Sequence, residues 1–418
     1  MKEKEYLAFG YLLAMAVIIP WSNALTNLLM AGGVLFIIQN IITNKKRSSE
    51  TNKLNKVLFA LVAAFVMLVL INILANKDYT ALKYLARIAT IILLPTMIYV
   101  MAIKIPHKQK LKVLQYYVHS VFALSLGTIV VAFSKTLLEA STPFNLINLT
   151  YFELSNSLVH HEPIYFSIMV GAAILFGSST LYINKINEKS IIYYIELVFL
   201  LLFLFLLGSR TAIVSTFIGL GILAATKSRK LLVYLIISFS LLFLMNYKFN
   251  SSFQSRVDHV VNFSKDFDYQ NDWSYEGLAL RYMTWNCSFE GIKENFMFGT
   301  GISEAQTYLN NCYKENKYES LLYFNRQNGT VFNSHNTYLD VFLKFGIFGM
   351  VILATILILL ILSAIKNRNT LLLITVTFFM LNGLTESILV REKGIIFFSF
   401  FLGLFLCFKS RQNQFNTI

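Results

Sequence analysis

The clearest candidate for acid–base chemistry in this sequence is a histidine that directly precedes a long apolar run. Residues 333–338 read Asn-Ser-His-Asn-Thr-Tyr, and an apolar segment follows over 338–365. Ser334 or Asn333 can cap a helix there, which would place His335 near a helix N-terminus, where imidazolium is disfavoured. A neutral imidazole is what a general base requires, and the same helix end attracts phosphate. An interfacial histidine that only hydrogen-bonds to the cap is the alternative.

Two arginines lie where apolar runs begin. Arg210 follows Gly208-Ser209 between two runs with almost no linker. Leaving its charge in hydrocarbon would cost about 2.5–3.5 kcal/mol, so we expect it to face a wet cavity or an anion. Arg87 lies one turn into the run 84–103 and is interpreted in the same way. A snorkelling arginine with a solvated guanidinium is the alternative for both.

Further polar residues flank apolar runs on the same predicted side. Glu386 and Arg391 bracket the end of the run 370–389. Glu386 is predicted either to orient His335 or to pair with an arginine. His160 and His161 precede Pro163, which is predicted to occupy the first turn of the helix formed by the run 163–183.

Two intramembrane polar residues, His119 and Glu196, are predicted to be packing partners rather than catalysts.

The composition predicts a membrane protein. Of 418 residues, 56% are hydrophobic and 14% charged, with a mean hydropathy of +0.59. A soluble domain carries about 25% charged residues, so one soluble core would not hide this apolar surface. The 36 Lys and Arg residues against 22 Asp and Glu flank apolar runs and form no single basic face, which argues against nucleic-acid binding. Three cysteines exclude a disulfide framework.

Twelve apolar runs are long enough to be candidate membrane helices. Strands are excluded because the runs do not alternate. The first run has a basic start but no cleavage site within reach, so it is interpreted as an anchor. The runs are 5–21, 24–43, 57–75, 84–103, 113–133, 163–183, 190–207, 211–226, 231–247, 338–365, 370–389 and 394–408.

The distribution of Lys and Arg predicts the orientation. With the N-terminus in the cytoplasm, 20 of them fall in inner segments and 6 in short outer ones. The positive-inside rule therefore places both termini in the cytoplasm. Two outer segments, 134–162 and 248–336, are too long to be turns and are where we expect function.

The expected organisation follows from these segments. Residues 1–247 hold nine membrane helices, 248–336 form one large outer loop, and 337–418 hold three more helices and a cytoplasmic tail. Within the large loop, aromatic and aliphatic residues recur at spacings of 3 and 4, which predicts an amphipathic helix on the membrane surface or over a cavity. They are Tyr282, Trp285, Phe289, Ile292 and Phe296.

Two other interpretations of the large loop stay open. Asp266-Phe267-Asp268, with Asp272 nearby, is a possible Asp-x-Asp metal site, but a solvated acidic loop is favoured, because nucleotide sugars are cytoplasmic and this loop is predicted to lie outside. Cys287 and Cys312 either pair in this loop or remain thiols, and Cys407 is expected to be buried.

These motifs together resemble the bacterial O-antigen ligase and polymerase family of membrane glycosyltransferases. The resemblance is clearest from about residue 160 to 400. It rests on the order of four groups: Ser209-Arg210, Arg281 to Trp285 followed by Gly299 and Gly301, His335-Asn336-x-Tyr338-Leu339 followed by Gly346 and Gly349, and Glu386 to Arg391.

The resemblance implies an all-α, GT-C-like membrane fold in the bacterial inner membrane, with a periplasmic active site. It implies a glycan on undecaprenyl pyrophosphate as donor, lipid A-core or a lipid-linked glycan as acceptor, and inversion without a metal or other cofactor. His335 would be catalytic, and Arg210 and Arg281 would contact the pyrophosphate of the donor. From its own position in the sequence, Arg87 is also predicted to bind the donor. Supporting positions would be Glu386, Arg391, Asn336 and His161.

Three activities remain to be separated. A ligase passes a finished chain to lipid A-core, whereas a polymerase passes it to the next lipid-linked repeat unit. The single large loop before the tenth run favours the ligase. A transporter of lipid-linked glycan is the alternative of another class, but neither matched helix breaks nor related halves occur in the sequence.

Overall fold

The computed structural model describes residues 2–43, 53–77, 79–103, 105–138, 151–159, 161–184, 191–226, 229–249, 253–255, 257–258, 277–328 and 331–408. Within these residues the chain is helical and contains no strand. The helices are α1 (Lys2–Ile18), α2 (Asn23–Thr43), α3 (Lys53–Ala75), η1 (Tyr79–Ala81), α4 (Leu82–Ala102), α5 (His107–Leu138), α6 (Tyr151–Asn156), α7 (Pro163–Asn184), α8 (Ile191–Leu207), α9 (Arg210–Ala225), α10 (Arg229–Phe249), α12 (Gly277–Glu294), α13 (Ile302–Glu315), α14 (Glu319–Asn328), α15 (Thr337–Lys366), α16 (Thr370–Gly383) and α17 (Glu392–Phe405).

The twelve predicted runs correspond in order to α1–α5, α7–α10 and α15–α17, so the prediction of an all-helical, multi-pass membrane protein is confirmed. Six described segments are long and apolar enough to cross a membrane alone. They are Val57–Ala75, Leu82–Ala102, His107–Leu138, Pro163–Tyr182, Leu232–Phe249 and Thr337–Lys366. Helices such as α16 and α17 have 14 residues each, about 21 Å, and are shorter than the hydrocarbon core. The number twelve and the GT-C-like arrangement stay predictions.

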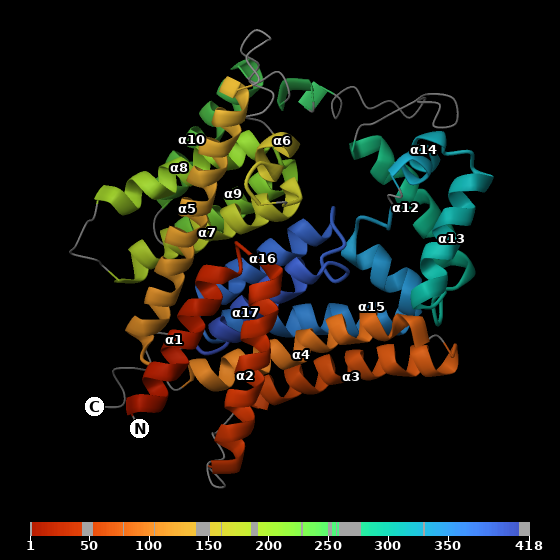
Figure 1. The fold of residues 1–418 in the computed structure, drawn as a ribbon, viewed down its shortest axis with the longest axis horizontal. Coiled ribbons are helices and arrows are strands. Elements are labelled where there is room, and N and C mark those ends of the chain that lie inside the picture. The colour runs from red at the N-terminus through yellow and green to blue at the C-terminus, as the bar shows by residue number, and fades with distance from the viewer. Residues whose placement is uncertain are drawn as a thin grey trace.

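Helix α17 lies in the middle of the bundle, beside α4 and α16 (Figure 1). A helix that is apolar on every side must be enclosed by other helices or by lipid. Here it is enclosed by helices, because its aromatic side chains are all buried and pack edge to face with one another. These side chains are Phe397, Phe398, Phe400, Phe401 and Phe405.

Helix ends contact one another in two groups. At one end, Lys110 Nζ in the first turn of α5 donates to the carbonyl oxygen of Cys407 at 3.0 Å. At the other end, His161 Nε2 donates to the carbonyl oxygen of Pro20 at 2.6 Å, which joins the start of α7 to the α1–α2 connection. The first turn of α5 therefore lies where α17 ends, and the membrane side to which these ends belong stays a prediction.

Helix α15 is broken near its start, which the run 338–365 does not predict. Gly346 has φ 62° and ψ −158°, a backbone conformation that favours glycine. The segment after α12 packs here: the Thr300 N–H donates to the Leu343 carbonyl oxygen at 2.7 Å. A Cβ atom on Gly346 would lie 2.2 Å from the carbonyl oxygen of Met297. The close approach of two backbones thus accounts for both the glycine and the break.

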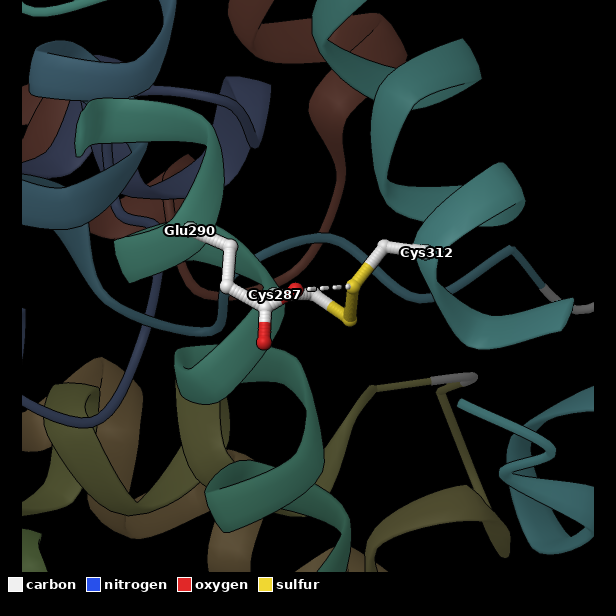
Figure 2. A group of neighbouring side chains, drawn as sticks. All are labelled: Cys287, Glu290 and Cys312. Atoms are coloured by element: carbon white, nitrogen blue, oxygen red, sulfur yellow. Dashed lines mark hydrogen bonds between the residues drawn. A yellow bond between two sulfur atoms is a disulfide. The ribbon is translucent and has the colours of Figure 1, made fainter. Parts of the chain in front are cut away.

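Helices α12–α14 form a unit beside the outer ends of α3 and α4 (Figure 1). A disulfide between Cys287 of α12 and Cys312 of α13 joins two of them, with Cα atoms 5.8 Å apart, and Glu290 lies beside it (Figure 2). The open question of pairing is therefore answered in the structure. Because both sulfur atoms are in the disulfide, the cluster of Cys287, Glu290 and Cys312 has no thiolate to offer a metal.

The predicted amphipathic helix is α12, but its buried face differs from the predicted stripe. Met283, Cys287 and Gly291 are buried against α13 and α15. Tyr282 and Phe289 of the stripe are 45% and 50% exposed. Ile292 of the stripe is nevertheless buried and Trp285 packs against the same cluster, so the predicted stripe is divided between the packed and the exposed sides of α12.

Candidate active site

The site is built where the segment before α15 meets the connection between α16 and α17. Three hydrogen bonds join them closely. Asn336 Nδ2 donates to the Leu384 carbonyl oxygen at 3.0 Å, and the Asn336 N–H donates to Ser387 Oγ at 3.2 Å. Thr337 Oγ1 donates to the Glu386 carbonyl oxygen at 2.7 Å. Each bond contributes about 0.5–1.5 kcal/mol net, so together they fix His335 relative to Glu386.

The helix cap is Asn336, and the prediction that Ser334 or Asn333 caps the helix is wrong. The Asn336 side chain accepts hydrogen bonds from the N–H groups of Tyr338 and Leu339. Asn333 instead accepts from the N–H of His335 at 2.8 Å, and Ser334 is buried. The cap is two residues beyond Ser334 because Asn336 combines the extended backbone of a cap with a side chain that faces the first turn.

His335 has an unusual backbone conformation, with φ 42°. Non-glycine residues rarely adopt this left-handed region, although histidine is among those that do so more often. The hydrogen bonds of Asn333 and Asn336 on either side hold it there. Such a conformation at a polar surface site indicates a fixed side-chain direction.

The imidazole of His335 faces the carboxylate of Glu386, with Nδ1 3.5 Å from Oε2. The His335 side chain is 26% exposed and that of Glu386 is 3% exposed. Burial favours a raised pKa for Glu386, but the hydrogen bond and charge of His335, with the charges of Arg281 and Arg391, outweigh burial and lower the pKa. An ionised Glu386 accepts a hydrogen bond from Nδ1–H, and this tautomer of His335 leaves the lone pair on Nε2.

Arg281 and Thr211, the residue after Arg210, both contact Thr385, the residue before Glu386. Arg281 Nε donates to the Thr385 carbonyl oxygen at 3.2 Å, and its charge lowers the pKa of Glu386. The next residue after Arg210, Thr211, lies with its Oγ1 2.8 Å from that of Thr385. The first turns of α9 and α12 therefore converge on the same connection that carries Glu386.

Arg87 and Arg391 lie at the other end of that connection. Arg87 Nη1 donates to the Val390 carbonyl oxygen at 3.4 Å, and Arg391 Nη2 lies 3.3 Å from Glu162 Oε1. Both line a pocket of about 260 Å³. The full lining is Asn23, Arg87, Glu162, Tyr165, Val390, Arg391, Glu392 and Lys393. Arg87 is therefore grouped with Arg391 and Lys393 in a pocket that adjoins Glu386, because the Tyr165 side chain of its lining lies beside that carboxylate and the charge of Arg391 acts on it.

His161 lies behind this pocket, buried, and contacts Lys393. Its Nε2 donates to the Pro20 carbonyl oxygen, and its Nδ1 accepts from the Lys393 ammonium. Burial, with the nearby charge of Lys393, lowers the pKa of His161 to about 4. A neutral ring with one donating and one accepting nitrogen fits both contacts, so His161 positions Lys393. His160 lies outside the described residues.

Asp340 and Lys344 form a buried ion pair one turn into α15, which the sequence interpretation missed. Lys344 Nζ lies 2.7 Å from Asp340 Oδ2 and 4.9 Å from the centre of the Tyr84 ring. The spacing of four residues on one helix was the signal that could have identified the pair.

His119 and Glu196 contact each other, with Nδ1 2.8 Å from Oε2, and so join α5 to α8. Their role as packing partners rather than catalysts stays a prediction. The alternative Asp266-x-Asp268 metal site, with Asp272, lies outside the described residues.

Residues 195–354 match a family model described as O-antigen ligase. This range contains Arg210, Arg281 and His335, and it ends before Glu386. No curated protein matches the chain.

Proposed function

Because the match over residues 195–354 supports the O-antigen ligase family for this chain, we propose that the protein is a membrane glycosyltransferase of the ligase or polymerase type. It transfers a glycan from undecaprenyl pyrophosphate to a sugar hydroxyl of an acceptor. The reaction takes place on the periplasmic face of the bacterial inner membrane, and the acceptor of a ligase is lipid A-core. The positive-inside distribution of Lys and Arg supports this orientation.

The proposal rests on one observation: the imidazole of His335, the buried carboxylate of Glu386 and the guanidinium of Arg281 meet at the connection between α16 and α17. Glu386 lies 3.5 Å from His335 Nδ1, and Arg281 binds the carbonyl oxygen of the adjacent Thr385. A base oriented by a carboxylate is the arrangement that proton transfer from a hydroxyl needs. A cation beside the base is what a departing pyrophosphate needs.

In the proposed step, Nε2 of His335 takes the proton of the acceptor hydroxyl. The acceptor oxygen forms a bond to the anomeric carbon of the donor sugar as the bond from that carbon to the pyrophosphate oxygen breaks. The bonding electrons leave with undecaprenyl pyrophosphate, and the proton remains on the imidazole beside Glu386. A single displacement of this kind inverts the anomeric carbon.

Arg210 and Arg281 are proposed to stabilise the negative charge that develops on the leaving pyrophosphate. A guanidinium is charged at any physiological pH and presents a planar fork that matches phosphate oxygens. Glu386 is a positioning residue here, because it touches His335 and no substrate atom.

The polymerase reaction is the second candidate, and one observation favours it. The structure has a second cationic pocket, lined by Arg87, Arg391 and Lys393, apart from the contacts of Arg281 with Thr385. Two lipid-linked substrates would make use of two such groups of cations.

A transfer assay with purified protein tests the proposal. The wild type, given a glycan on undecaprenyl pyrophosphate and an acceptor glycolipid, is expected to release undecaprenyl pyrophosphate and form a longer glycan. His335→Ala is expected to abolish transfer while the protein stays inserted. His119→Ala is the matched control, because it removes a histidine that also pairs with a glutamate. Near wild-type activity of His335→Ala would remove His335 from the mechanism.

The lipopolysaccharide of a deletion strain separates ligase from polymerase. Loss of a polymerase leaves lipopolysaccharide with a single repeat unit. Loss of a ligase leaves bare core, with polymer accumulated on its lipid carrier. A purified protein that moves lipid-linked glycan across liposomes without forming glycosidic bonds would instead indicate a transporter.

A further inference from the structure

The turn that follows α12 exposes three consecutive large apolar side chains. Phe296, Met297 and Phe298 are 48%, 50% and 73% exposed, beyond the end of a helix whose buried side packs against α13 and α15. Gly299 closes the turn with φ 73°, and a Cβ atom there would lie 2.5 Å from the backbone of Lys344. Single apolar side chains on a surface need no explanation, whereas a contiguous group marks a surface that meets a partner or a membrane.

The backbone of this turn is fixed to α15 at the break of that helix. The Ile347 N–H donates to the Phe296 carbonyl oxygen at 2.9 Å, and the Thr300 N–H donates to the Leu343 carbonyl oxygen at 2.7 Å. A break in a helix leaves backbone groups without an intrahelical partner, and the turn supplies partners on both sides of Gly346. The outward direction of the three side chains is therefore set by the fold.

The exposed turn is continuous with one side of α15. The ring centre of Phe298 lies 5.7 Å from that of Phe348, which is 46% exposed. Beyond Phe348, the large exposed side chains of α15 recur at helical spacings and form one stripe, which consists of Val351, Ile358, Leu362 and Ile365. Because α15 is apolar and long enough to cross a membrane, this stripe faces hydrocarbon. The side chains of residues 296–298 extend the same surface.

The position of the turn along the helices places it at the edge of the hydrocarbon. From Gly346 to Ile365, α15 extends about 28 Å, close to the thickness of about 30 Å of a hydrocarbon core. On the other side of the turn, a Cβ atom on Gly301 would lie 3.1 Å from Nδ2 of Asn76, which directly follows the apolar segment Val57–Ala75. Two apolar segments thus end beside the turn, at the level where aromatic side chains are enriched in membrane proteins.

We propose that residues 296–298, together with Phe348, form a membrane anchor that inserts into the lipid leaflet at this end of α15. The occupant is lipid hydrocarbon, because the surface is apolar, joins a lipid-facing stripe and lies level with helix ends. Lys293 and Glu294, exposed on α12 just before the turn, lie among the lipid headgroups. The anchor holds the end of α12 opposite to Arg281, and it does not depend on the proposed glycosyl transfer.

Quenching by brominated lipids tests the anchor in the full-length protein in nanodiscs. Phe298→Trp, Val351→Trp and Lys314→Trp are each compared with wild type, so that the fluorescence added by one tryptophan is measured. Phe298→Trp is expected to lose most of this added fluorescence in phosphatidylcholine brominated in the upper part of its acyl chains, and little of it in aqueous iodide. Val351→Trp, on the lipid-facing stripe, is the control for lipid contact, and Lys314→Trp, exposed on α13, is the control for water.

Photolabelling of wild-type protein tests the same contact without a substitution. A phosphatidylcholine that carries a diazirine on its acyl chain is expected to label the peptide containing residues 296–298. The exposed polar residues Lys314 and Lys317 of the α13 end are expected to remain unlabelled. Labelling at the two lysines and none at residues 296–298 would overturn the proposal, whatever the behaviour of the tryptophan variants.

The two quenchers also separate lipid from the other possible occupants. Quenching of Phe298→Trp by iodide and not by brominated lipid would show that the turn lies in water, which contradicts the anchor. Protection from both quenchers would show that protein covers the turn, either a second copy of the chain or another partner, and would equally overturn it. Quenching by brominated lipid together with labelling of residues 296–298 is the result that the anchor requires.

Discussion

Nδ1 of His335 lies 3.5 Å from Oε2 of Glu386, although the two residues lie 51 positions apart on segments flanking different helices. The contact is enforced by the backbone, because Thr337 Oγ1 donates to the Glu386 carbonyl oxygen and accepts from the Ile388 N–H. The base and its positioning residue are therefore held by the same local structure.

Replacing Glu386 by Gln is expected to lower kcat about 100-fold with little change in KM for either substrate, because the residue acts through His335. Transfer rates with purified protein at varied donor and acceptor concentrations provide this measurement. The lowered pKa of Glu386 means that its carboxylate remains ionised as pH falls through the ordinary range of a glutamate, and its stabilising contribution is lost only below that. A larger effect on KM than on kcat would instead indicate that Glu386 contacts a substrate directly.

Replacing Asn336 by Ala is expected to destabilise the protein by about 1–2 kcal/mol, because the cap of α15 loses both its accepted hydrogen bonds. Asn336→Asp keeps the accepting oxygen but cannot donate to the Leu384 carbonyl oxygen, so its loss should be smaller. Thermal unfolding in detergent compares the two. Equal stability of Asn336→Ala and wild type would contradict the assigned cap.

Removing one charge of the buried ion pair of Asp340 and Lys344 is expected to destabilise the protein far more than removing both charges. Asp340→Asn leaves Lys344 buried without its counter-charge, which destabilises by about 3–5 kcal/mol. The double variant Asp340→Leu with Lys344→Met should recover much of that loss. Yield of folded protein and thermal midpoint report the comparison, and additive losses in the double variant would refute the pairing.

Removing the disulfide is expected to destabilise the α12–α14 unit by about 2–4 kcal/mol, since it closes a loop with a sequence separation of 25. Cys312→Ser is compared with Cys407→Ser, which changes an unpaired, buried cysteine. Mobility on gels with and without reductant reports pairing, and limited proteolysis reports loosening of the unit. Free thiols at both Cys287 and Cys312 in wild-type protein would rule the bond out.

The neutral state of His161 gives the protein a pH-dependent stability. Its pKa is about 4 in the folded protein against an ordinary 6.5, so between these values the unfolded chain binds more protons. This contribution of about 3 kcal/mol is complete above pH 6.5 and is lost as pH falls towards 4.

The thermal midpoint of wild-type protein should therefore fall between pH 6.5 and 4.5. His161→Gln, whose amide can donate to Pro20 and accept from Lys393, should show a shallower fall. His107→Gln, at the opposite end of the bundle, is the control. Identical pH curves for wild type and His161→Gln would show that His161 is not the group responsible.

Hydropathy predicts the membrane helices well because a continuous apolar run is recognised from the types of its own residues, without knowledge of contacts with distant parts of the chain. Each predicted run corresponds to a helix, and a contact of Glu386 with His335 was one of two expectations from polar residues flanking the runs, whereas Arg281 was expected from the family resemblance. The break of α15 was not predictable in this way, because Gly346 stands in an apolar run and its conformation is set by Met297 from another segment.

Side-chain partners that are distant in sequence were likewise beyond prediction. Asn336 was singled out as a polar neighbour of His335, but its role as the cap depends on the local backbone that Ser387 and Leu384 hold. The separation of Arg87 from Arg281 depends on which end of one short connection each contacts. Neither relationship leaves a signal in residue spacing.

Single-turnover transfer tests the central claim most directly, with radiolabelled donor bound to an excess of purified protein before acceptor is added. The account predicts that His335→Ala binds the donor as wild type does but transfers at least about 100-fold more slowly, while Arg281→Gln loses donor affinity. Transfer by His335→Ala at the wild-type rate, or unchanged donor binding by both Arg281→Gln and Arg210→Gln, would contradict it.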